Sequence, residues 1–214
     1  MISFQKFAEE KTAALIVMIL VAVSVGLLIT AVPQFGMKSA TTPLPGMKPL
    51  DALQQTGRDI YVREGCYNCH SQQIRPFRAE TERYGHYSVG GESVWDHPFQ
   101  WGSKRTGPDL ARVGGRYNDA WHVMHLNDPR SVVAGSIMPA FPFLAKNTVD
   151  PETAKAHMRT LRIVGVPYTD EDIAAADEVM FDVADDGTKT PKTELDALIA
   201  YLQTLGTSLK DTTN

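Results

Sequence analysis

The apolar positions of the chain are concentrated in one unbroken run near the amino terminus. Residues 12–32 make up this run, and no charged residue occurs between residues 12 and 37. As a helix the run is about 31 Å long, which matches the roughly 30 Å hydrocarbon core of a bilayer. It predicts a transmembrane helix over about 12–32. The alternative is a cleaved signal peptide, but the run exceeds a usual signal core and no clear cleavage site follows Pro33.

Beyond this run, apolar positions recur at helical spacing and helix start signals appear in five shorter segments. The segments cover residues 51–62, 119–127, 150–165, 169–184 and 193–205. Thr193 with Asp196 approximates a capping box, and Gly206 follows as a stop signal. The pattern predicts a mainly α fold.

A change in composition separates the apolar run from the rest of the chain. Residues 38–48, KSATTPLPGMK, are rich in Ser, Thr, Pro and Gly and are typical of an extended linker. We therefore expect a membrane anchor over 1–37, a linker over 38–48 and a domain over 49–214. Within that domain, residues 144–191 form an expected acidic helical insertion that is longer than a minimal domain of this kind needs.

The charge and the cysteine count exclude several classes of protein. The net charge is −4, so no nucleic-acid partner is expected, and two cysteines cannot form a multi-bridge disulfide framework. Residues 144–214 hold 7 basic and 13 acidic residues, which places the acidity in the last third. Lys6 and Lys11 precede the apolar run, so the positive-inside rule predicts a cytoplasmic amino end and a domain on the opposite side of the membrane.

The segment Cys66-Tyr67-Asn68-Cys69-His70 has the C-x-x-C-H spacing that attaches a c-type haem. On one turn, two thiols can form thioethers to one haem edge while the next residue offers an imidazole to the iron. The alternatives are a thioredoxin-like redox pair and half of a zinc site. No βαβ pattern surrounds the motif and no second pair of ligands stands at zinc spacing, so covalent haem is predicted, with His70 as proximal ligand.

The second axial ligand decides between electron transfer and an open site that binds small molecules. Met138 is favoured because two prolines hold its segment, GSIMPAFP, in a non-helical loop. His122, Met124 and His125 fall in a predicted helix, where packing on one face is the expected role. The other candidates outside the apolar run are His86, His97, His157, Met37, Met47, Met158 and Met180. Of these, Met158 and Met180 are predicted to lie in the core.

These motifs in this order resemble class I cytochromes c. The shared features are a helix with Gly57 and Tyr61 before C-x-x-C-H, the segment GPDL at 107–110, a Met-Pro loop and a carboxy-terminal helix with Tyr. The resemblance implies that the Pro108 carbonyl accepts the imidazole proton of His70. It also implies that Arg116 binds a haem propionate, although a solvated loop cation is the alternative.

The stretch CHSQQIRP at 69–76, the segment Trp101-Gly102-Ser103 and the single anchor resemble the mono-haem cytochrome c subunit of cbb3-type cytochrome c oxidases. This resemblance implies a subunit in the bacterial inner membrane with its haem domain in the periplasm. It would take electrons from a dihaem cytochrome c subunit and pass them to haem b of the catalytic subunit, without oxygen chemistry of its own. The resemblance also implies calcium at the interface with the catalytic subunit, with Ser103 as the candidate contact.

Two other functions and two surface interpretations stay open at this point. The chain could be the anchored cytochrome subunit of a nitric oxide reductase, which CHSQQIRP disfavours, or a haem-based sensor, which the Met-Pro loop disfavours. The aromatic residues of 71–103 either cover the haem or face a partner. The acidic residues of 144–191 either steer a basic partner or form a solvated face, and the solvated face is favoured.

Overall fold

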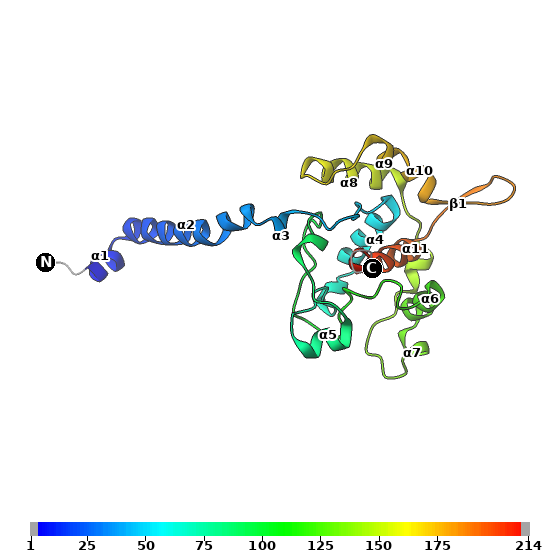
Figure 1. Ribbon diagram of the computed structural model, residues 1–214, viewed down its shortest axis with the longest axis horizontal. Helices are drawn as coiled ribbons and strands as arrows, with labels where there is room; N and C mark the ends of the chain where they lie inside the picture. Colours follow the sequence, from blue (N-terminus) through cyan, green and yellow to red (C-terminus); the bar gives the residue numbers. More distant parts are fainter. Residues whose placement is uncertain (1–3, 211–214) are drawn as a thin grey trace. The chain divides into compact units, whose positions relative to one another are not determined.

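The computed structural model of the chain describes residues 4–210 and is mainly helical, the fold class that the sequence predicts (Figure 1). The outermost residues of the predicted anchor and domain, 1–3 and 211–214, lie outside the described residues. Two compact units are present, one ending at Thr42 and one beginning at Pro43. The elements of the first unit are α1 (Phe4–Glu10), α2 (Thr12–Gly36) and α3 (Lys38–Thr41). Those of the second are α4 (Ala52–Arg63), η1 (Cys66–Asn68), α5 (Arg78–Tyr84), η2 (Gly90–Glu92), α6 (Asp119–Asn127), α7 (Pro129–Val132), η3 (Pro142–Ala145), α8 (Pro151–Ile163), α9 (Asp170–Ala174), α10 (Ala176–Val179), β1 (Phe181–Val183), β2 (Lys189–Pro191), α11 (Glu194–Thr204) and α12 (Thr207–Lys210).

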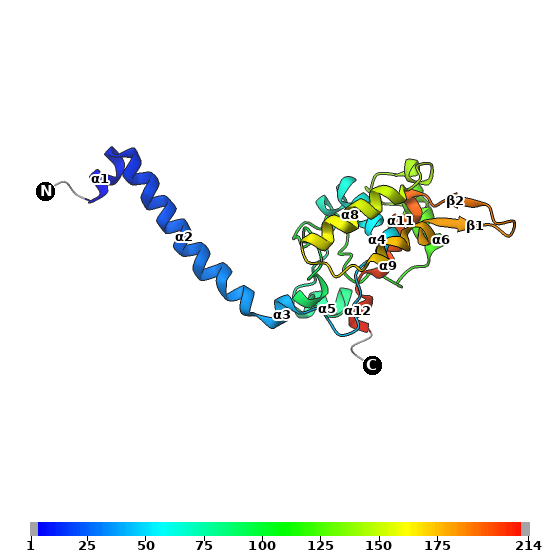
Figure 2. The same cartoon turned by 90° about the horizontal axis from the view of Figure 1, so that it is seen from above.

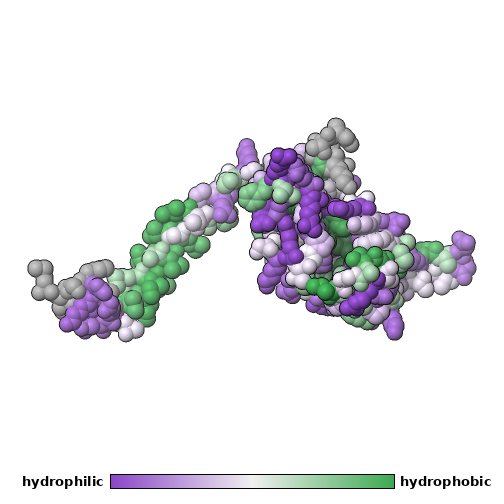
Figure 3. Space-filling model, turned by 90° about the horizontal axis from the view of Figure 1, so that it is seen from below, coloured by the Kyte–Doolittle hydropathy of each residue, from purple (hydrophilic) through white to green (hydrophobic). Residues whose placement is uncertain are grey.

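Helix α2 is long and apolar enough to cross a membrane, by length and composition. Figure 3 shows it covered by apolar side chains, whereas the visible face of the second unit is mostly polar. The helix continues to Gly36, four residues beyond the predicted end, and includes Pro33. Because Pro33 lies in the last turn, its missing N–H removes one hydrogen bond close to the C-terminal end of the helix and leaves the rest of the helix intact.

The predicted linker is not extended throughout. Its first four residues form the single turn α3, closed by a hydrogen bond of 2.9 Å from Thr42 N to Lys38 O. No proline or glycine occurs between Lys38 and Pro43, so nothing in these residues opposes a helical turn. The expectation of an extended stalk was wrong for this part of the linker.

The second unit is built around the packed pair α4 and α11, the helices predicted at 51–62 and 193–205 (Figure 2). Each begins with a capping box: Asp51 with Gln54 in α4, which was not predicted from the sequence, and Thr193 with Asp196 in α11, which was. Gly206, at φ 79°, ends the α11 segment in the left-handed region that favours glycine.

Gly57 allows α4 and α11 to approach at backbone distance. A Cβ at this position would lie 1.9 Å from the carbonyl oxygen of Ala197. One turn later, the rings of Tyr61 and Tyr201 meet edge to face with centroids 5.6 Å apart. The crossing therefore depends on one residue without a side chain, followed by an aromatic contact.

The segment after α8 differs from the single helix predicted over 169–184. That helix is divided into the short α9 and α10, and Phe181–Val183 forms an antiparallel hairpin with Lys189–Pro191. The hairpin projects from the domain in both ribbon views (Figures 1 and 2). Its turn contains Gly187 at φ 82°, and the Asp-Gly pair there is a hairpin signal that the helix prediction overlooked. Met158 and Met180 are fully buried, so their predicted core role is confirmed.

The excursion between residues 71 and 103, with α5 and η2, is attached to α4 through Arg58. This guanidinium is almost fully buried, donates to the carbonyl oxygens of His97 (3.1 Å) and Pro98, and lies 3.3 Å from a carboxylate oxygen of Asp96. Trp95 packs against the core, whereas four other aromatic side chains of the excursion are exposed. They are Phe77, Tyr87, Phe99 and Trp101.

We predict that Gly57→Ala lowers the free energy of unfolding by about 2 kcal/mol, because overpacking separates α4 from α11. Denaturant unfolding of the haem-loaded protein, followed by far-UV circular dichroism, measures the change. Gly102→Ala is the matched control, since no heavy atom lies within 4 Å of its Cβ position. Equal stability of the two variants would contradict the close helix crossing.

Candidate haem-binding site

The C-x-x-C-H segment forms one tight turn directly after α4. Gly65 has φ 70° and reverses the chain at the helix end, so that η1 can follow. The carbonyl oxygen of Cys66 then accepts from Cys69 N at 3.1 Å and from His70 N at 2.9 Å. The two thiols are not joined in a disulfide. Burial raises the pKa of the Cys66 thiol to about 11, so it is protonated at neutral pH.

The imidazole of His70 is held on two sides by the GPDL segment. Its Nδ1 lies 2.8 Å from the carbonyl oxygen of Pro108. Because a carbonyl can only accept, Nδ1 carries a proton, and in the neutral form of the ring the lone pair is then on Nε2. Gly107 lies so close that a Cβ there would be 2.3 Å from Cε1 of His70. This segment therefore sets both the tautomer and the position of the ring.

A cavity of about 630 Å³ gathers the predicted haem residues from distant parts of the chain. The turn after α4, the 106–113 segment, α6, the Met-Pro loop and α11 all contribute to its wall. Six predicted residues line it: Cys66, Cys69, His70, Pro108, Arg116 and Met138. Tyr61, Leu198 and Leu202 bring the α4–α11 pair to the same wall.

Met138 is half-buried in the loop between α7 and η3 and packs against the core. Its backbone N donates to the hydroxyl of Ser136 at 3.2 Å, which holds the loop without helical hydrogen bonds. Met124, by contrast, is 51% exposed on α6 and does not line the cavity. Met138, and not Met124, therefore lines the same cavity as His70.

Two histidines of α6 also line the cavity, which the sequence did not predict. His122 is only 3% exposed, and its buried Nε2 has no hydrogen-bond partner within the described part of the chain. The same holds for Nδ1 of His125. Burial lowers the pKa of both rings and favours their neutral forms. Their spacing of three residues on a helix, beside Trp121, was a signal that both face one surface.

The mouth of the cavity carries a stack of rings next to Arg116. Trp121 stacks on Tyr117 with centroids 3.9 Å apart and on His125 at 4.6 Å. The exposed guanidinium of Arg116 lies 5.9 Å from the centre of the Tyr117 ring. From the excursion, only Arg83 and Tyr84 reach this cavity, so most of its aromatic residues do not cover it.

Ser103 lies away from the cavity and is exposed. Among residues 4–210, no three His, Cys, Asp or Glu side chains form a group that could hold a metal ion. Calcium also takes carbonyl, hydroxyl and water oxygens, so this result does not test the calcium contact at Ser103, which stays a prediction.

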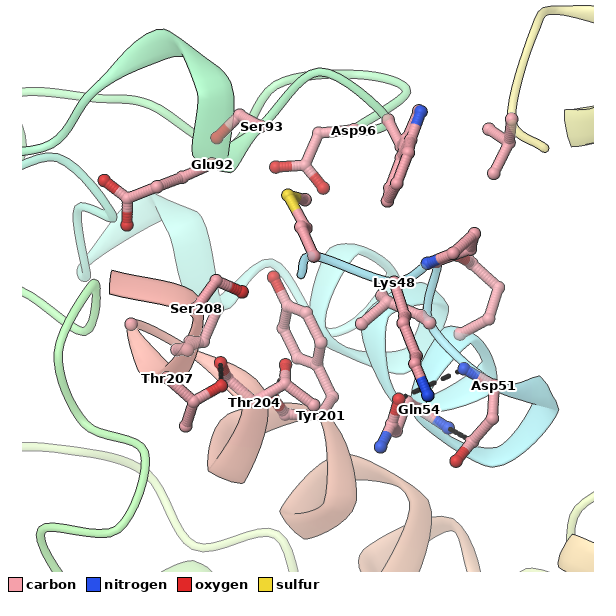
Figure 4. Close-up of a pocket in the computed structure, with 18 of the residues that line it drawn as sticks. Lys48, Asp51, Gln54, Glu92, Ser93, Asp96, Tyr201, Thr204, Thr207 and Ser208 are labelled. Carbon is pink, nitrogen blue, oxygen red and sulfur yellow. Dashed lines mark hydrogen bonds between the residues drawn. The ribbon is translucent and has the colours of Figure 1, made fainter. Parts of the chain in front are cut away.

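A second cavity, of about 820 Å³, lies on another side of the α4–α11 pair (Figure 4). Asp96 and Tyr201 point into it from opposite walls, and Lys48, Glu92 and Ser208 add further polar groups. It contains neither cysteine and no histidine. Chemically it does not suit a covalent haem.

The first cavity does suit a haem. Its volume is within the range of about 300–1,000 Å³ that is usual for cofactor sites. It offers two thiols on one turn, an imidazole lone pair and a thioether. The unpartnered nitrogens of His122 and His125 are further evidence, because buried polar atoms without a partner are rare unless a bound group satisfies them.

A family model described as cytochrome c oxidase, mono-haem subunit/FixO, matches residues 5–209. None of the curated proteins is similar enough to the chain to be matched. The matched range includes α2 and every residue that lines the 630 Å³ cavity. The expected cytochrome c-like fold and a single haem agree with this family.

We predict that Gly107→Ala displaces the His70 ring from Pro108 and reduces the fraction of chains that hold haem. The new methyl group would occupy the space of Cε1, and relief of this overlap costs about 2 kcal/mol. The haem-to-protein ratio of purified chain, from absorbance in alkaline pyridine, measures the effect. Gly102→Ala serves as control, and an equal haem content in both variants would show that the contact is unimportant.

Proposed function

The chain belongs to the mono-haem subunit/FixO family of cytochrome c oxidases, and from this premise we propose that it is the electron-transfer subunit of a cbb3-type oxidase. It receives electrons from a dihaem cytochrome c subunit and passes them to haem b of the catalytic subunit, where oxygen is reduced. The chain itself reduces no oxygen. The observation that carries this proposal is the cavity that brings the C-x-x-C-H turn and Met138 together.

In this proposal each residue of the cavity has a distinct task. Cys66 and Cys69 form the thioethers, the Nε2 lone pair of His70 binds the iron, and Met138 is the sixth ligand. Pro108 keeps the His70 tautomer through the bond to Nδ1, and Arg116 pairs with a propionate at the mouth. A bound haem supplies a one-electron couple between ferric and ferrous iron. With three further side chains, Met138, His122 and His125, in the wall, an open sensor-type position is disfavoured.

The anchor supports a location in the bacterial inner membrane. Helix α2 supplies the single span, and Lys6 and Lys11 before it favour a cytoplasmic amino end. The domain that begins near Pro49 then lies in the periplasm. The anchor therefore keeps the haem near its membrane-bound acceptor and takes no part in the chemistry.

Exposed apolar side chains support two contact surfaces for the partners. The first lies at the haem cavity and consists of Tyr117, Val133 and Ile137, which line the cavity and are exposed. It suits short-lived contact with an electron-carrying subunit, because electrons cross where the haem edge is accessible. The second consists of the four exposed aromatic residues of the excursion. We assign it to the catalytic subunit. Ser103, the candidate calcium contact, follows two residues after Trp101 in the sequence.

The function is tested by Cys66→Ala and Cys69→Ala in the host membrane. We expect each variant to lose most of its covalent haem and the membranes to lose oxidation of reduced cytochrome c, since each thiol forms one thioether. Haem staining of denatured chains and oxygen uptake are the measurements. Asn68→Ala is the control, because it alters the same exposed turn and keeps both thiols.

Full haem staining in both cysteine variants would exclude the c-type attachment. Affinity purification of the unmodified chain provides the second arm. A b-haem membrane subunit should purify with it, and recovery of the chain without any such subunit would exclude the oxidase assignment.

We predict that Met138→Ala opens the iron to carbon monoxide, whereas Met138→His keeps a six-coordinate haem at lower potential. A neutral thioether stabilises ferrous iron better than a second imidazole does, and each 59 mV corresponds to about 1.4 kcal/mol. Absorbance spectra and redox titration detect both effects. Met124→Ala should change neither, since this side chain is exposed outside the cavity. Carbon monoxide binding in His122→Phe but not in Met138→Ala would move the sixth ligand to α6.

A further inference from the structure

A cluster of charged side chains lies beside the segment that carries Pro108. Glu80 and Asp109 are its anions, with side chains 9% and 0% exposed, and Arg105 is its central cation. The hydroxyl of Ser71 and the guanidinium of Arg75 complete it. None of these five side chains lines the haem cavity except Asp109, and no role proposed above uses the cluster.

Arg105 joins three parts of the chain through one planar group. Its guanidinium donates to both carboxylate oxygens of Glu80 at 2.7 Å. It also donates to Ser71 Oγ and to the carbonyl oxygen of Gln73, both at 2.8 Å. Five donors in a rigid fork make such a bridge directional, and lysine cannot reproduce it.

Asp109 connects this bridge to the backbone of the iron ligand. Its Oδ2 accepts from Ser71 Oγ at 2.6 Å and from Gln73 N at 2.9 Å. On either side, Gly107 N donates to Cys69 O and Leu110 N donates to Ser71 O, each at 2.9 Å. The residues that flank Pro108 are therefore bound to the residues that flank His70.

Glu80 balances the charge that makes the bridge stable. It accepts from Arg75 as well as Arg105, and the Arg105 hydrogen bond lowers the pKa of its carboxyl to about 2. Glu80 therefore remains ionised at neutral pH. Without it, the largely buried Arg105 would keep Asp109, at 3.3 Å, as its anionic partner and would lose the carboxylate that accepts its two shortest hydrogen bonds. A buried charge that loses its partner is strongly unfavourable.

We propose that Glu80 and Arg105 are positioning residues for His70. By holding residues 107–110 against 69–73, they fix the Pro108 carbonyl relative to Nδ1 and so set the strength of that hydrogen bond. A stronger bond gives the imidazole more anionic character, which stabilises ferric iron and lowers the reduction potential. This inference rests on the proposed haem function, since it concerns how the potential of that haem is set.

The test uses the full chain, loaded with haem, in detergent micelles, and compares two variants of the cluster with one control variant. Glu80→Gln removes the anion, and Arg105→Lys keeps the charge but loses the planar fork. We expect the Nδ1 proton of His70 to exchange with water about tenfold faster in both, because the carbonyl is held less firmly. We also expect a higher midpoint potential in both. NMR of ¹⁵N-histidine-labelled ferrous protein and redox titration provide the readouts.

Glu82→Gln is the matched control. It lies on the same helix, removes the same charge, and belongs to an exposed pair with Arg78. Its exchange rate and potential should equal those of the unmodified chain. Because Arg105→Lys keeps the net charge, a change there reports geometry and not electrostatics alone.

Unchanged exchange and potential in Arg105→Lys would overturn the proposal, as would an equal shift in Glu82→Gln and Glu80→Gln. If Glu80→Gln does not accumulate, Arg105→Lys decides alone. Failure of the proposed function looks different, because the unmodified chain would then carry no covalent haem or would purify without a b-haem membrane subunit.

Discussion

The hydrogen bond from His70 to the carbonyl oxygen of Pro108 joins segments that are 38 residues apart, and the rest of the domain is arranged around it. It requires Gly107, because any side chain there would collide with the ring. It also requires the tight turn after α4, which Gly65 makes by adopting a positive φ. Once the ring is placed, it lines a cavity to which α4, α6 and α11 also contribute residues.

The excursion after His70 is more than a surface addition. Arg58 binds its far end to α4, and Glu80 binds its near end to Arg105. The Arg58 guanidinium and the Glu80 carboxylate are both largely buried, and burial of a charged group lowers stability unless the group is paired. The exposed aromatic residues of the excursion are thus presented on a segment with two fixed attachments, as a defined contact surface requires.

Several acidic residues of 144–191 form ion pairs with basic residues of the same segment. Lys155 contacts both Glu152 and Asp177, and Arg162 pairs with Asp170, so several of its acids are neutralised locally. His157 binds Asp59 at 2.6 Å and attaches α8 to α4. These contacts favour the solvated-face interpretation over a free anionic patch.

The sequence by itself determined the features that depend on near neighbours. These are the long apolar helix, the capped helices α4 and α11, α6 with its predicted bounds, and the C-x-x-C-H turn. The sequence-based prediction of one helix over 169–184 was wrong, because the chain leaves the helix to form a hairpin with an Asp-Gly turn. The prediction of an extended linker was wrong at the short turn α3. Only the tertiary structure decided that His122 and His125 line the cavity. The same holds for the ion pair of Glu80 and Arg105 beside the segment that carries Pro108. Such contacts join segments far apart in the chain, and their geometry depends on how the whole core closes, which no local pattern records.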